Sequence, residues 1–133
     1  MSAGHEPYWV PAVAMRAMHR EQILEHGGLQ GIRSATALEA TLARPRQCWD
    51  YSELNTILQL AAAYAEALIR AHPFADGNKR SGFLVAVAFL GLNGFRFNAS
   101  NQEVVLTIRR LGTAELPWAD LQVWFEANNS GPS

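Results

Sequence analysis

The segment that most constrains this chain is SGFLVAVAFLGLNGF, residues 81–95, an apolar stretch without a single charge. From 79 to 92, apolar side chains fall on nearly every face of a helix, so the pattern predicts a helix that is buried all round. The stretch is shorter than the roughly 20 residues that a membrane-spanning helix needs. Other helices must therefore cover it, and we expect a protein core built around this helix.

Helical periodicity dominates the rest of the chain, and strand signals are weak. The apolar spacing predicts helices over 12–25, from Ser34 as N-cap to about Arg44, from Glu53 to about Ala71, over Val104–Leu111, and from near Pro117 to about Asn128. Gly27 and Gly28 favour an end to the first of these helices. We therefore expect an all-α fold, a compact helical bundle around the 79–92 helix.

Two stretches break the pattern. RPRQCWDYS, residues 44–52, contains Pro45 and is predicted to be an irregular or hairpin segment. The tail NNSGPS, 128–133, is predicted to be frayed. A length of 133 residues indicates one domain, 1–133, with a core at about 12–128 and flexible ends. The side chains expected to face inward near the carboxyl end are Trp118, Leu121, Trp124 and Phe125.

Composition excludes several classes of function. With 49% hydrophobic and 17% charged residues, the chain can bury a core. Its net charge of -1 offers no broad basic surface, so we expect neither direct nucleic-acid binding nor membrane binding. The single cysteine, Cys48, forms no internal disulfide, and the N-terminus does not resemble a signal peptide. A cytoplasmic location fits both observations.

The most polar cluster of the chain, HPFADGNKR at 72–80, stands directly before the buried helix. We expect Asn78 or Asp76 to cap this helix. The N-terminus of a helix presents N–H groups without helical partners and the positive end of the helix dipole, and both favour a phosphate. Gly77 allows the backbone to approach a ligand closely. Lys79 and Arg80 in the first turn add positive charge for a bound phosphate.

The remaining polar residues of the cluster suggest group transfer. A carboxylate beside a phosphate repels it unless a cation intervenes, so Asp76 points to Mg²⁺. His72 is a base that titrates near neutral pH. Each residue taken alone also fits a structural role: a helix cap for His72, turn residues for Asp76 and Asn78, or a solvated first turn for Lys79 and Arg80. Cations at a helix N-terminus oppose the dipole, however, and such local conflicts are expected at functional sites.

The segment HPFADGNKR resembles the signature of the Fic/Doc superfamily, His-x-Phe-x-Asp/Glu-Gly/Ala-Asn-Gly/Lys-Arg, at every position. The similarity extends to HGGLQGIRSATALEATLARP, 26–45, and AFLGLNGFRF, 88–97, which look like segments of Doc-type (death-on-curing) toxins. In all it covers roughly residues 12–128. Typical Fic adenylyltransferases have Gly at the position of Lys79 and a second Arg at the position of Phe83, so this chain resembles the Doc type more closely.

The resemblance implies a kinase that transfers the γ-phosphate of ATP to a threonine of elongation factor Tu and blocks translation. It implies that His72 is the base, that Asp76 holds Mg²⁺, and that Asn78, Lys79 and Arg80 bind phosphates together with the backbone of Gly77. Arg80 would also act in catalysis, and Phe74 would anchor the loop. In the 44–52 segment, Arg44, Arg46, Trp49 and Tyr51 match in position the flap that lines the target site in Fic-type proteins.

The inhibitory Ser/Thr-x-x-x-Glu-Gly/Asn motif of self-regulated Fic proteins is not found in the sequence. The resemblance therefore implies a cognate Phd-like antitoxin whose tail forms a helix in a groove beside the active site. Two alternatives stay open: a nucleotidyl (AMP) transferase on the same scaffold, and a non-catalytic binding module. His19 and His26, seven residues apart, lack the further ligands that a metal site needs.

Overall fold

The structure, a computed structural model, describes residues 5–51, 56–113 and 120–130. Within these ranges the chain forms helices α1 (Ala12–His26), α2 (Ala35–Asp50), α3 (Ile57–Ala71), α4 (Asn78–Leu92), α5 (Asn101–Gly112) and α6 (Leu121–Ala127). The short strands β1 (Arg96–Phe97) and β2 (Asn129–Ser130) pair antiparallel. The predicted all-α fold is confirmed. No helix of the described ranges is both long and apolar enough to span a membrane.

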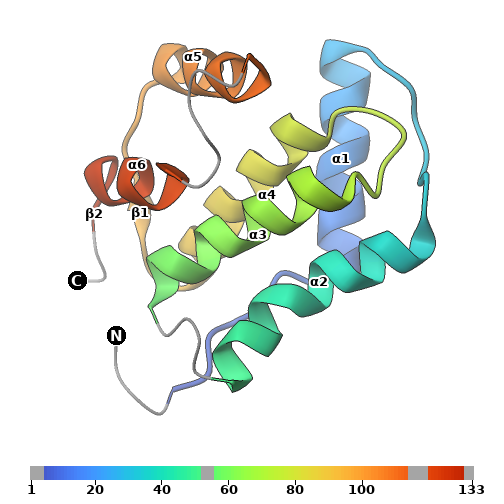
Figure 1. The fold of residues 1–133 in the computed structure, drawn as a ribbon. Helices are drawn as coiled ribbons and strands as arrows, with labels where there is room; N and C mark the ends of the chain where they lie inside the picture. The colour runs from blue at the N-terminus through green and yellow to red at the C-terminus, as the bar shows by residue number, and fades with distance from the viewer. Residues whose placement is uncertain (1–4, 52–55, 114–119, 131–133) are drawn as a thin grey trace.

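Helices α3 and α4 form the centre of the fold, and they run side by side in opposite directions (Figure 1). Tyr64 of α3 and Phe89 of α4 are buried, with ring centroids 5.0 Å apart. The two backbones approach closely at Gly82, where an added Cβ would lie 3.2 Å from the carbonyl oxygen of Ala65. The predicted buried helix is therefore confirmed as α4. Because α3 and α4 pack tightly together, the two ends of the 72–77 loop that connects them have fixed positions.

The other helices cover this pair. Helix α2 packs on α3, α1 and α5 pack on α4, and α6 packs on α3. Leu121 and Phe125 are fully buried as predicted, while Trp124 is half-buried with its ring 5.3 Å from that of Phe83. The predicted inward position of Trp118 and the predicted helix start near Pro117 lie outside the described residues.

The prediction that the second helix ends near Arg44 is wrong, because α2 continues through Pro45 to Asp50. A proline inside a helix removes one backbone hydrogen bond and commonly costs about 3 kcal/mol. Here the buried positions Leu38, Thr41, Pro45 and Cys48 recur at helical spacing across the proline. Burial of this continuous face therefore outweighs the missing hydrogen bond, and the 44–50 stretch is neither irregular nor a hairpin.

The other boundaries agree closely with the prediction, except at the carboxyl end. Helix α1 ends at Gly27, whose φ of 86° suits a glycine cap. Helix α3 begins after Thr56 with a capping box, and the predicted start at Glu53 lies outside the described residues. Asn129 and Ser130, predicted to be frayed, instead form β2 against β1. Before α1, the backbone N–H of Val10 donates to the Tyr64 hydroxyl at 3.1 Å.

Candidate active site

The loop from 72 to 77, which joins α3 to α4, borders a cleft of about 380 Å³. The lining residues are His72, Ala75, Asp76, Gly77, Asn78, Lys79, Arg80 and Ile108. The structure thus brings every polar residue of the predicted site to one place, at the N-terminal end of α4. Phe74 does not line this cleft; its ring is buried on the other side of the loop.

His72 caps α3 in a left-handed conformation, with φ 48° and ψ 55°. It is the one non-glycine residue with positive φ in the described part of the chain. For an L-residue this conformation costs roughly 1–2 kcal/mol, so it persists only where surrounding contacts fix it. Arg33 provides such contacts: its Nε donates to the His72 carbonyl at 2.6 Å, and its Nη2 donates to the Ala71 carbonyl at 2.8 Å.

The side chain of Asn78 closes the loop from inside. Its Oδ1 accepts from the Phe74 N–H, and its Nδ2 donates to the Phe74 carbonyl, both at 3.1 Å. The prediction that Asn78 or Asp76 caps α4 is wrong, because the N-cap is Gly77 and no side chain caps the helix. Asn78 is instead occupied with the loop, and Asp76 bonds to the N–H of Gly77. What Asn78 offers the cleft is its backbone N–H.

Asn78 also faces the ring of His72, with its Nδ2 at 3.3 Å from Nδ1. Because Oδ1 of Asn78 accepts from a backbone N–H, the amide group that faces the ring is a donor. At 3.3 Å this contact is long, so it fixes neither tautomer of the ring.

Helix α1 holds the far side of the loop. The ring of His19 stacks on Phe74 with centroids 3.8 Å apart, and its Nε2 lies 2.8 Å from the Asp76 carbonyl oxygen. One helical turn further along, Gln22 donates to the Gly77 carbonyl at 3.4 Å. Phe74 is therefore a buried anchor, as predicted, and His19 is its partner. His26 lies exposed at the end of α1, and no group of three or more metal-ligating side chains occurs among the described residues.

Asp76 stands at the mouth of the cleft. Its Oδ1 accepts from the N–H of Gly77 at 2.9 Å, and its Oδ2 lies 3.3 Å from the N–H of Leu29. Gly28 makes room for it, since a Cβ there would lie 2.8 Å from Oδ2. One exposed carboxylate beside a phosphate site suits Mg²⁺, which commonly takes one or two carboxylates and completes its shell with phosphate oxygens and water. The donor set therefore fits a magnesium ion that arrives with a nucleotide.

The N-terminus of α4 is shaped for an anion. Gly77 has φ 73°, a left-handed conformation that favours glycine, and an added Cβ would push aside the end of the Gln22 side chain. The first turn of a helix carries N–H groups without helical partners, and no side chain caps this one. Lys79 and Arg80 are half-buried in the same turn. Lys79 and Arg80 thus add full positive charges to the partial charges of this helix N-terminus, in the cleft that His72 also lines.

His19, Gln22 and Arg33 were not recognised from the sequence as parts of this site. All three act on the loop from positions 39 to 57 residues away, through its backbone carbonyls. The backbone of 31–34 also follows the loop, with Ala75 N–H donating to the Gly31 carbonyl at 3.0 Å. Carbonyl groups carry no sequence signal, so these contacts follow only from the fold.

The expected flap does not form within the described residues. Arg44, Arg46 and Trp49 belong to α2, and none of them lines the cleft. Arg46 Nη2 lies 3.3 Å from Oε2 of Glu6, and Trp49 is half-buried against the core. Tyr51, directly after α2, is exposed. The flap was expected from the resemblance, and the structure instead places residues 44–50 in the continuous helix α2.

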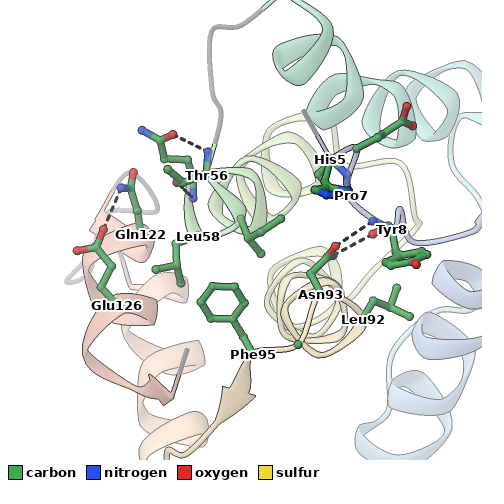
Figure 2. A pocket seen from close by; sticks show the side chains of 14 residues that line it. His5, Pro7, Tyr8, Thr56, Leu58, Leu92, Asn93, Phe95, Gln122 and Glu126 are labelled. Atoms are coloured by element: carbon green, nitrogen blue, oxygen red, sulfur yellow. Dashed lines mark hydrogen bonds between the residues drawn. The ribbon is translucent and has the colours of Figure 1, made fainter. Parts of the chain in front are cut away.

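Two of the other cavities are larger than this cleft. One of about 770 Å³ lies at the other end of α4, where Asn93 and Tyr8 exchange two hydrogen bonds and Leu58 and Phe95 add apolar surface (Figure 2). It contains none of the signature residues. The second, of about 610 Å³, is a groove between α1, α4 and α5. Arg80 and Ile108 line both this groove and the cleft at His72, so the two are adjacent.

Fold and site together define a class: a helical protein that presents a histidine, a carboxylate and two cations around the N-terminus of its central helix. The profile of the Fic/DOC family matches residues 9–90, and the chain belongs to this family. It is 33% identical over 92 residues to the protein kinase doc of Escherichia phage P1, a match that covers 69% of this chain and 73% of that protein. It is 34% identical over 74 residues to the toxin Doc of Mycolicibacterium smegmatis, covering 55% of this chain and 57% of that protein.

Proposed function

We propose that this protein is a Doc-type toxin that transfers the γ-phosphate of ATP to a serine or threonine hydroxyl of a translation factor, with elongation factor Tu as the first candidate. The observation that carries the proposal is that the polar residues of the Fic/Doc signature line one cleft together, with His72 beside the N-terminus of α4. The relative named protein kinase doc supports the kinase activity, and the relative named toxin Doc supports the role as a toxin. Such a target would place the reaction in the cytoplasm.

In the proposed reaction, the backbone N–H groups that follow Gly77, together with Lys79 and Arg80, bind the phosphates of ATP. Asp76 would hold Mg²⁺, which when bound neutralises charge on the phosphate oxygens. His72 removes the proton from the target hydroxyl. The hydroxyl oxygen then forms a bond to the γ-phosphorus, and the bond from that phosphorus to the bridging oxygen breaks. ADP leaves with the electron pair, and the catalytic contribution is mostly positioning and charge stabilisation.

Two positions favour phosphate transfer over AMP transfer. Lys79 adds a long side chain where typical Fic adenylyltransferases have glycine. Phe83, where those enzymes have a second arginine, is fully buried, with its ring 5.7 Å from that of Phe125. This position therefore supplies core packing and no phosphate ligand. A nucleotidyl transferase remains the alternative that the experiment below separates.

We propose that a Phd-like antitoxin neutralises the toxin by laying an amphipathic helix in the groove between α1, α4 and α5. The groove has apolar side chains, among them Leu84, Val87 and Val105, and it carries Glu21 and Glu25 along α1. Because the groove adjoins the cleft at Arg80, one bound segment could cover the proposed phosphate site as well.

The test is the intact mass of elongation factor Tu after incubation with this protein, ATP and Mg²⁺. We expect a gain of about 80 Da, the mass of a phosphoryl group, whereas AMP transfer adds about 329 Da. Loss of a general base typically lowers the rate about 10²- to 10⁴-fold, so His72→Ala should remove the gain within the same incubation. His26→Ala, which changes an exposed histidine outside the cleft, is the matched control and should behave like the wild type.

A folded His72→Ala protein with wild-type activity would refute the mechanism. A gain of AMP size would establish the alternative transferase. Intact ATP with every translation factor tested, together with unchanged growth on expression, would favour a non-catalytic binding module.

A further inference from the structure

Arg33 binds three successive carbonyl groups, that of the last residue of α3 and those of the first two residues of the active-site loop. Its backbone N–H donates to Pro73 at 2.7 Å, its Nε to His72 at 2.6 Å and its Nη2 to Ala71 at 2.8 Å. The Ala71 and His72 carbonyls stand at the end of α3, where a helix leaves its carbonyls without partners. A guanidinium suits them because its planar fork offers two donors in fixed geometry.

These contacts hold the backbone at His72, which is the one non-glycine residue with positive φ in the described part of the chain. In that left-handed conformation, the orientation of the peptide after His72 determines where the imidazole is placed. The Arg33 fork holds the carbonyl of this peptide and of the one before it. The imidazole then lies with Nδ1 3.3 Å from Asn78 Nδ2, on the cleft side of the loop.

We propose that Arg33 is a positioning residue for the base: its guanidinium fixes the backbone of His72 and thereby directs the imidazole toward the target hydroxyl. The inference rests on the proposed transfer reaction. Arg33 does not line the cleft and so acts through His72 rather than on the reacting groups.

The phosphate-binding half of the loop is held by different contacts. His19 and Gln22 of α1 bind the carbonyls of Asp76 and Gly77, and neither side chain contacts Arg33 by hydrogen bond. Loss of the Arg33 side chain therefore disturbs the base while it leaves the ATP site in place. Arg33→Ala should lower kcat without a comparable rise in KM for ATP. General destabilisation of the fold does not separate the two parameters in this way.

The experiment compares the wild type with Arg33→Ala, Arg33→Lys and Arg16→Ala in the transfer assay. The alanine variant keeps the main-chain bond to Pro73, so the segment should stay docked. Small misplacements of a catalytic group can reduce rates about 100-fold, and we expect kcat to fall by about tenfold to 100-fold. Lysine, with one charged group in place of the fork, should recover only part of this loss. Arg16→Ala, an exposed arginine of α1, should match the wild type.

Two readouts separate positioning from a merely structural role. Millimolar guanidinium should restore activity to Arg33→Ala, since the free ion can donate to both carbonyls, whereas sodium at the same concentration should not. The ¹⁵N resonances of the His72 ring should also move in Arg33→Ala, because the contact between Nδ1 and Asn78 changes. This second readout needs no activity.

The inference is overturned if folded Arg33→Ala keeps kcat within about twofold of the wild type, a change too small for a misplaced base. It is equally overturned if the His72 ring resonances coincide with those of the wild type. If the wild-type protein itself transfers nothing, the proposed function fails, and the ring resonances alone then decide whether Arg33 positions His72.

Discussion

At the level of single residues, the active-site loop depends on backbone conformations that few side chains allow. His72 at φ 48° and Gly77 at φ 73° begin and end the loop, and both are left-handed. Between them, the ring of Phe74 is buried and Asp76 lines the cleft, while Asn78, directly after Gly77, binds the backbone of Phe74 from inside the loop. The loop is therefore rigid where the proposed chemistry needs a fixed base and a fixed phosphate site.

Replacement of Gly77 by alanine tests this constraint. Positive φ costs an alanine roughly 1–2 kcal/mol, and the new Cβ would in addition displace the Gln22 amide. We expect urea denaturation to show that Gly77→Ala loses more unfolding free energy than Gly27→Ala, whose φ is 86° but whose Cβ meets nothing within 4 Å.

The double variant with Gln22→Ala distinguishes the collision from the backbone strain. Removal of the Gln22 side chain should recover part of the stability that Gly77→Ala loses, since neighbouring sites couple by about 0.5–3 kcal/mol. Strictly additive losses would show that the Gln22 contact contributes nothing to the requirement for glycine.

How much of the site was predictable also differs from residue to residue. His72, Phe74, Asp76 and Arg80 lie in one contiguous segment with a strong signature, and the structure brings them to one loop and its following helix turn. His19 illustrates the limit: a lone histidine on a helix gives no hint that it will stack on a ring 55 residues later. Only the packing of α1 against the loop reveals its role.

At the level of helices, the periodic spacing of apolar residues predicted the extent of a helix better than local helix-breaking residues such as Pro45 did. The apolar face of α2 passes through Pro45 without interruption, and the helix follows that face rather than the proline. The pairing of β1 with β2 was not predicted, because strands of two residues have no periodicity that a sequence pattern could reveal. Tertiary packing therefore decided both cases against local propensity.

Helix α5 offers a prediction about pH. Glu103 closes a capping box with Ser100, and hydrogen bonds from the backbone and then the hydroxyl of Ser100 lower the pKa of this carboxyl below its ordinary 4.5. A lowered pKa means that the folded state favours the ionised form. The stabilisation is therefore present above pH 4.5 and is lost as the pH falls through the folded-state value.

Glu103→Gln keeps a capping side chain but removes the charge. We expect the wild type to exceed this variant in unfolding free energy at neutral pH, and the difference to vanish progressively below pH 4.5. Chemical denaturation over a pH series measures it, with Glu39→Gln on the exposed surface of α2 as the control. A difference that stays constant with pH would contradict the role of the ionised carboxyl.

At the level of the whole molecule, the arrangement of helices joins two surfaces that the sequence keeps apart. Helix α5 supplies Ile108 to both the His72 cleft and the groove, and Arg80 at the start of α4 lines both as well. A partner that fills the groove is therefore within reach of the phosphate site. This geometry supports the proposed neutralisation by an antitoxin, in which a helix bound in the groove would also cover the cleft.

Val105 tests that mechanism without touching the cleft. Val105 lines the groove on α5 and is 48% exposed, so Val105→Glu should fold normally. The new charge would lie against the apolar face of a bound helix, in the groove that also contains Glu21 and Glu25. We expect the dissociation constant of the cognate antitoxin, measured calorimetrically, to rise at least tenfold, which is about 1.4 kcal/mol. Val123→Glu, an exposed valine of α6 outside the groove, is the matched control and should bind like the wild type. Equal binding by both variants would locate the antitoxin on another face, and transfer activity retained by both would confirm that the groove and the chemistry are separable.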